Sequence, residues 1–176
     1  MAAILLSGLR QIEKLIDLPI FLDLDQKVSV IVAARNEEQH IRPSIESLLR
    51  QEYGNLELLA INDRSTDKTG EILDEFARGD SRLQVTHLTE LPSGWLGKNH
   101  ALQYGAARAS GKWLLFSDAD VVMSPTTLRR AVSFAVNGKV DHLAMMPEIR
   151  MPSLLLEAFV SVFVVGFSLF FRPWKA

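Results

Sequence analysis

Two aspartates stand one residue apart where an apolar stretch of the chain ends. The stretch reads "LLFSDADVV" over residues 114–122, and the pair is Asp118 and Asp120. In extended backbone, residues i and i+2 point to the same side, so both carboxylates could address one ligand. Two such carboxylates resist ionising together unless a cation lies between them. Mg²⁺ or Mn²⁺ suits the pair, because these ions prefer oxygen ligands and take further ones from water and substrate phosphates. A pair of acids in an ordinary surface turn is the alternative.

Other polar residues follow strand-like stretches in the same way. Arg35, Asn36 and Glu37 come directly after the apolar run "VSVIVAA", and Asp63 comes shortly after "LELLAI". Lys98 lies in the loop "LPSGWLGKNH". Each has a plainer interpretation, since Asp63 could cap the next helix, Glu37 could favour a helix dipole and Lys98 could simply be solvated. The shared position after strands favours a common site.

Strand-like and helix-like stretches alternate through the middle of the chain. Apolar runs of strand length are separated by segments in which apolar residues recur at helical spacing. The short links between them predict an α/β domain with a mostly parallel sheet and helices on both faces. Such folds bind ligands at the carboxyl ends of their strands, near a switch in strand order. The expected strands are 28–34, 56–61, 83–88, 112–117 and 140–145, and the expected helices lie around 41–49, 72–76, 101–109 and 125–136.

Composition limits the classes of protein to consider. The 176 residues are enough for one domain with a core, and the apolar fraction of 48% and charged fraction of 23% are those of a globular protein. A net charge of −2 gives no electrostatic case for nucleic-acid binding. The absence of cysteine excludes disulfides, thiolate metal sites and a cysteine nucleophile.

The two ends of the chain differ from the middle. Residues 1–26 include an amphipathic helical pattern that could lie on a membrane or pack on the domain. Residues 151–176 include "SLLLEAFVSVFVVGFSLFF", which carries one charge, Glu157. As a helix this stretch would be about 28 Å long, close to the apolar thickness of a bilayer. We expect it to contact a membrane, in its plane or across it, and a buried core helix is the alternative. The domain itself is then 27–150.

Three segments together resemble family 2 glycosyltransferases with a GT-A fold. "VSVIVAARNEEQHI" resembles their opening strand, and "LLAINDRSTDKTGEIL" is similar to their second strand and its Asp-x-Ser-Thr-Asp turn. "GWLGKNHALQYGAARASGKWLLFSDADV" is similar to their donor-site helix and Asp-x-Asp strand. Its Gly-Trp-x-Gly-Lys element resembles a membrane-associated branch that includes hopanoid- and carotenoid-associated and ceramide-type glycosyltransferases. The resemblance covers roughly residues 27–150, and several motifs in the right order make it specific.

The resemblance implies an activity and a site. The activity is transfer of a sugar from a nucleotide-diphospho-sugar to an acceptor hydroxyl, with Mg²⁺ or Mn²⁺ and a lysine stabilising the departing diphosphate. The apolar end suggests a lipid acceptor and a membrane-associated protein whose site faces the cytoplasm. Asp120 would bind the metal, Asp118 the metal or the ribose, Asp63 the base or ribose, and Lys98 the phosphates. The positions implied for nucleotide-sugar binding are Ala33, Arg35, Glu37, Asp63, Lys98 and Asp118.

The sequence departs from the family pattern in three places. Arg35 stands where many relatives have a tyrosine, and it could stack on the base instead. Asn62 replaces the first of two aspartates that often follow the second strand. Later in the chain no acid fits the general base, Asp141 and Glu148 included. We therefore expect the base beyond Ala176, and the chain to be the N-terminal, donor-binding part of a longer protein, inactive alone.

Other classes of protein fit the same residues less well. A haloacid-dehalogenase-like phosphatase would have its Asp-x-Asp motif near the start of its domain, but three strand–helix units precede the motif here. A metal-dependent nucleotidyltransferase or a Rossmann dehydrogenase needs a glycine-rich loop after the first strand, and "AARNEEQH" contains no glycine. The alternative outside enzymes is a non-catalytic, membrane-bound nucleotide-binding protein of the same fold.

Overall fold

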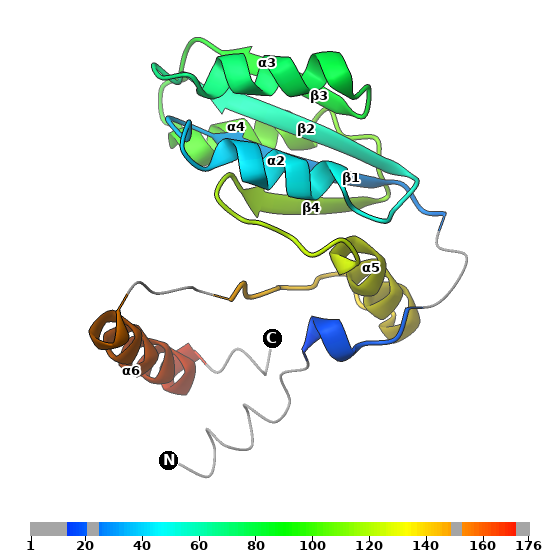
Figure 1. The fold of residues 1–176 in the computed structure, drawn as a ribbon, viewed down its shortest axis with the longest axis vertical. Coiled ribbons are helices and arrows are strands. Elements are labelled where there is room, and N and C mark those ends of the chain that lie inside the picture. The colour runs from blue at the N-terminus through cyan, green and yellow to red at the C-terminus, as the bar shows by residue number, and fades with distance from the viewer. Residues whose placement is uncertain (1–13, 21–24, 149–152, 172–176) are drawn as a thin grey trace.

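The computed structural model describes residues 14–20, 25–148 and 153–171 (Figure 1). Strands alternate with helices in these residues, as the sequence predicts. The strands are β1 (Val28–Ala34), β2 (Leu56–Asp63), β3 (Leu83–Leu88) and β4 (Trp113–Asp118). The helices are a short 3₁₀ turn, η1 (Leu15–Asp17), and α2 (Ile41–Leu49), α3 (Thr69–Gly79), α4 (Gly97–Ala106), α5 (Thr127–Gly138) and α6 (Leu154–Phe171).

The strands form one parallel sheet in the order β3-β2-β1-β4. The chain leaves β1 toward β2 on one side and later returns to pair β4 with the other side of β1. The strand order therefore switches at β1, and ligands bind at such a switch in folds of this kind. The register sets Ala33 beside Ile61 of β2 and beside Asp118 of β4, so the strand ends meet at one edge.

The sheet is covered on both faces, with α2 and α4 on opposite sides (Figure 1). Side chains of β1 and β2 are buried almost throughout, which fits their unbroken apolar sequence. On one face, Val30 and Leu58 join a core cluster with Ile45 of α2, Leu73 of α3 and Leu128 of α5. On the other face α4 lies directly on the sheet, because a Cβ added to Gly105 would be 2.5 Å from Ile31 Cγ2.

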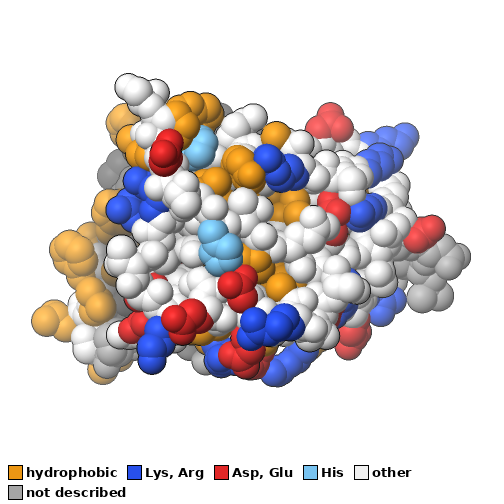
Figure 2. Space-filling view, turned by 90° about the horizontal axis from the view of Figure 1, so that it is seen from above, with side chains coloured by type: hydrophobic (Ala, Val, Ile, Leu, Met, Phe, Trp, Pro, Cys, Tyr) orange, Lys and Arg blue, Asp and Glu red, His pale blue; other side chains and the backbone are white. Residues whose placement is uncertain are grey.

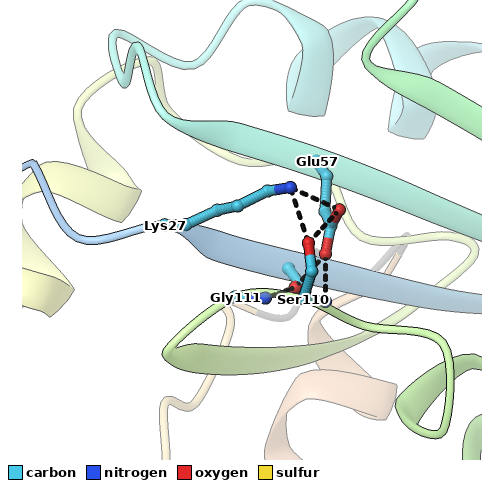
Figure 3. A network of polar contacts seen from close by, with 5 residues as sticks. Lys27, Glu57, Ser110 and Gly111 are labelled. Carbon is cyan, nitrogen blue, oxygen red and sulfur yellow. Dashed lines mark hydrogen bonds and ion pairs between the residues drawn. The ribbon is translucent and has the colours of Figure 1, made fainter.

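A buried polar network fastens the connection between α4 and β4 to the start of the sheet (Figure 3). At its centre is Glu57 of β2, which accepts hydrogen bonds from the Ser110 amide at 2.6 Å and the Ser110 hydroxyl at 2.9 Å. Lys27 Nζ lies 2.8 Å from the same carboxylate, and Ser29 donates its hydroxyl to it. Gly111 N in turn donates to Ser29 Oγ at 2.7 Å. The network thereby fixes where β4 begins beside β1.

Two expectations differ from the structure, and a third is not tested by it. The strand predicted over 140–145 is wrong: these residues have no regular structure and are only partly buried or exposed, so no neighbouring strand stabilises them. The backbone of the acidic pair is not extended, since β4 ends at Asp118 and Asp120 lies in a turn. Most of the predicted N-terminal helix, residues 1–13, lies outside the described residues.

The C-terminal apolar segment is helical, as α6. Large hydrophobic side chains are exposed on it, among them Leu154, Leu155, Phe159, Val162, Phe163 and Phe170. In the described part of the chain, no helix combines the length and the apolarity needed to cross a bilayer. On the face shown in Figure 2, acidic and basic side chains are interspersed rather than gathered by sign, in keeping with the net charge of −2.

Candidate functional site

A cavity of about 400 Å³ lies at the carboxyl ends of β1, β2 and β4. The start of α4 closes it on one side. All the residues that the sequence predicts for a ligand site line this cavity, although they come from four separate parts of the chain. The lining residues are Ala33, Ala34, Arg35, Glu37, Asp63, Gly97, Lys98, Asp118, Ala119 and Asp120.

The acidic pair faces the cavity from the end of β4 and the turn that follows. Asp118 and Asp120 are exposed, and Ala119 between them is buried. The turn thus brings both carboxylates to one cavity, although not by the extended backbone that the sequence suggests. Lys98 Nζ donates a 2.6 Å hydrogen bond to Asp118 Oδ1, so an ammonium group occupies one of the oxygens that a metal would take.

Asp63 is the buried acid of the site. Its side chain is only 4% exposed, and Arg64 holds both carboxylate oxygens: Nε is 2.7 Å from Oδ1 and Nη2 is 3.1 Å from Oδ2. These hydrogen bonds outweigh burial and lower the pKa of Asp63, with smaller contributions from the charges of Arg35 and His100. Asp63 is therefore ionised at neutral pH.

The loops after β1 and β2 are fastened to each other by side chains. Asn36 has a left-handed backbone (φ 56°), and its Oδ1 accepts a 2.8 Å hydrogen bond from the amide of Thr66. In return, Asn36 N donates to Ser65 Oγ at 3.0 Å, and Glu37 N donates to Thr69 Oγ1 at 2.8 Å. The cavity wall that carries Arg35 and Glu37 is consequently held in place by the loop that follows Asp63.

Sequence reasoning missed two residues next to Asp63, namely Arg64 and Gly97. A Cβ added to Gly97 would lie 2.6 Å from Asp63 Oδ2 and 2.8 Å from Arg64 Nη2, so a larger residue here would require α4 or this ion pair to move. The second glycine of "GWLGK", Gly97, was the feature of the sequence that could have indicated a close approach. The residues that it approaches become known only from the fold. Asn62 does not line the cavity; its Nδ2 instead lies 2.9 Å from His87 Nδ1.

The residues of the cavity fit a divalent cation that is shared with a substrate. The described residues contain no group of three or more His, Asp or Glu side chains placed to hold a metal alone. Asp118 and Asp120 supply two carboxylates, and Mg²⁺ or Mn²⁺ takes its other oxygen ligands from water and phosphate. The chemistry of this donor set therefore agrees with a metal bound together with a diphosphate.

The chain is similar in sequence to known glycosyltransferases. The Glycosyl transferase family 2 profile matches residues 29–152. An uncharacterized glycosyltransferase of Haemophilus influenzae is 38% identical over 119 residues, which are 68% of this chain and 35% of that protein. The UDP-Glc:alpha-D-GlcNAc-diphosphoundecaprenol beta-1,3-glucosyltransferase WfgD of Escherichia coli is 33% identical over 138 residues, 78% of this chain and 52% of the enzyme.

A solved structure with the same architecture is the mannosyltransferase PcManGT of Pyrobaculum calidifontis in complex with GDP-Man and Mn²⁺. It superposes with a TM-score of 0.59 at 27% sequence identity, over 76% of this chain and 40% of that one. The chain thus spans between about a third and about half of the length of these relatives. With a parallel α/β sheet, a cavity at its switch point and a profile match over most of its length, the chain belongs to glycosyltransferase family 2.

Proposed function

We propose that residues 27–150 form the donor-binding domain of a glycosyltransferase that transfers a sugar from a nucleotide-diphospho-sugar to an acceptor hydroxyl. The observation that carries this proposal is the meeting of Asp118, Asp120 and Lys98 in one cavity with the buried carboxylate of Asp63. A diphosphate needs a divalent cation and a positively charged side chain, whereas a nucleoside needs a hydrogen-bond acceptor beside them. The cavity offers two carboxylates for a cation, an ammonium group and a buried acceptor within about 400 Å³, a volume in the range of small-ligand sites.

Each lining residue has a role in the proposed reaction. Asp118 and Asp120 would hold Mg²⁺ or Mn²⁺, which would stabilise negative charge on the departing diphosphate. Asp63 would accept a hydrogen bond from the base or ribose, and Ala33, Arg35 and Glu37 would shape the nucleotide pocket. Lys98 would leave Asp118 for the phosphate oxygens when a metal takes its place, because its side chain is flexible and its present contact is an exposed one. The ammonium would then stabilise the leaving group.

We also propose that the complete protein works at a membrane and glycosylates a lipid or lipid-linked hydroxyl, as members of the membrane-associated branch would. Two observations support this. The exposed large hydrophobic side chains of α6 would be unfavourable in water and favourable at a lipid surface. The relative WfgD is named for an acceptor linked to diphosphoundecaprenol. Co-sedimentation with vesicles tests whether α6 binds a lipid surface. The chain should pellet with vesicles, and the double substitution Phe159→Ser with Phe163→Ser should reduce the fraction that pellets.

The donor site is tested by calorimetric titration of the chain with UDP and GDP, with and without Mn²⁺. We expect binding of one nucleotide that depends on Mn²⁺ and is lost in Asp120→Ala. Asp141→Ala is the matched control, because Asp141 is an exposed acid that does not line the cavity. Nucleotide binding that is absent, or that Asp120→Ala leaves unchanged, would refute the proposal.

A further inference from the structure

We propose that Arg64 is an internal competitor for the carboxylate of Asp63, and that a nucleoside reaches this carboxylate only by displacing the Arg64 guanidinium. The inference rests on the proposed nucleotide site and adds to it a residue that sets nucleotide affinity. Arg64 does not itself line the cavity; it holds the acid that does.

Little of the Asp63 carboxylate is accessible to a further donor while Arg64 is bound. Arg64 takes one hydrogen bond to each oxygen, at 2.7 and 3.1 Å. Gly97 closes the approach from α4, where even a methyl group would lie 2.6 Å from Oδ2. Only 4% of the Asp63 side chain remains exposed. A ribose hydroxyl or a base N–H can therefore contact this carboxylate only in the place of the guanidinium.

The backbone around Arg64 holds it in this position. Arg64 has φ 56°, a left-handed conformation that residues with a side chain seldom adopt. The next two residues are tied to Asn36, since Ser65 Oγ accepts from Asn36 N and Thr66 N donates to Asn36 Oδ1. Because these bonds fix the turn, release of Asp63 requires only a rotation of the Arg64 side chain.

The surroundings make such a release feasible. The Arg64 side chain is 22% exposed, so its guanidinium already borders solvent. Asp63 would keep the favourable charge of Arg35 nearby after Arg64 has left. The competent, released state would then be a fraction of the free protein, and the apparent affinity for a nucleotide is the intrinsic affinity multiplied by that fraction.

The test is calorimetric titration of the 176-residue chain and of Arg64→Gly with UDP and GDP in the presence of Mn²⁺. Glycine accepts φ 56° without strain, so the backbone of this variant should be kept, although the buried Asp63 carboxylate loses its partner; thermal melting verifies that the variant is folded at the temperature of the titration. Loss of a bidentate, charge-assisted competitor should raise nucleotide affinity about tenfold. Arg64→Lys keeps the positive charge but not the two parallel N–H donors of the guanidinium, so its nucleotide affinity should lie between those of the wild type and Arg64→Gly. Arg42→Ala removes a similar bidentate pair, with Glu75, outside the cavity and should change nothing.

Inorganic pyrophosphate with Mn²⁺ is the second probe, because it lacks the nucleoside. Its affinity should be the same in wild type and Arg64→Gly. A weaker affinity in the variant would show that Arg64 binds phosphate, and would overturn the inference. If the wild type binds nucleotide and Arg64→Gly binds it equally or more weakly, the inference about Arg64 is overturned, whereas the proposed function is not. Absence of nucleotide binding in both proteins would overturn the proposed function as well.

Discussion

The substitution Glu57→Gln should destabilise the domain by about 3 kcal/mol at neutral pH. Burial by itself would raise the pKa of Glu57, but hydrogen bonds from Lys27, Ser29 and Ser110 outweigh it and lower the pKa from 4.5 to about 2. A carboxyl group shifted so far on folding contributes about 3 kcal/mol, because one pKa unit corresponds to about 1.4 kcal/mol. Glutamine has nearly the same shape, but its amide nitrogen cannot accept from Ser29, Lys27 or Ser110.

The direction of the Glu57 pKa shift determines how the effect of this substitution changes with pH. The folded pKa lies below the unfolded one, so the stabilisation is fully present above pH 4.5 and is lost as the pH falls toward 2. The difference in unfolding free energy between wild type and Glu57→Gln should therefore fall from about 3 kcal/mol at pH 7 to about 2 kcal/mol at pH 3.5.

Urea unfolding followed by circular dichroism at the two pH values measures this difference. Glu75→Gln is the matched control, because Glu75 pairs with Arg42 on the surface, and exposed ion pairs contribute little. A difference below about 1 kcal/mol at pH 7, or one that does not shrink on acidification, would refute the reasoning from the Glu57 network.

Two further substitutions test the cavity directly. Lys98→Met should weaken binding of the Mn²⁺–nucleotide complex about tenfold, because it removes a charged contact to phosphate. Binding of Mn²⁺ without nucleotide should be unchanged or slightly stronger, because the Lys98 ammonium no longer competes for Asp118. Calorimetry with each ligand separates the two effects. Gly97→Ala should lower the melting temperature, because its Cβ would lie 2.6 Å from Asp63 Oδ2 and 2.8 Å from Arg64 Nη2; an unchanged melting temperature would show that α4 or these side chains can shift to make room.

The alternation of strands and helices could be predicted from the sequence because each strand is a buried apolar run bounded by polar loops. β1 and β2 are predicted best, since both faces are covered and their sequences need no alternation. Residues 140–145 have a similar apolar content without a pairing partner, and the pattern alone cannot reveal that. The parallel order of the strands follows from their helical connections.

The positions of the site residues could be predicted because carboxyl ends of parallel strands meet at one edge. Their contacts could not, because these depend on backbone detail. Nothing in "NDRS" indicates that Arg64 takes a left-handed conformation and binds the preceding residue. Likewise, the backbone turn that brings Asp118 and Asp120 to the same cavity has no signature in "DAD" beyond the acids themselves.

The two ion pairs of the cavity suggest how an acidic site stays folded without a metal. Lys98 neutralises Asp118 and Arg64 neutralises Asp63, so neither carboxylate is left without a positive partner. Binding of a nucleotide diphosphate with Mn²⁺ would then replace the ammonium of Lys98 at Asp118 by a metal ion, and the guanidinium of Arg64 at Asp63 by a neutral hydroxyl or N–H of the nucleoside. The exchange differs between the two acids. Asp118 and Lys98 are more than half exposed, so their pair contributes little and should yield readily to a metal. The pair of Asp63 and Arg64 is buried and bidentate, so the nucleoside half of the site should limit affinity. Variants of Arg64 should therefore change nucleotide binding more than variants of Lys98 change metal binding.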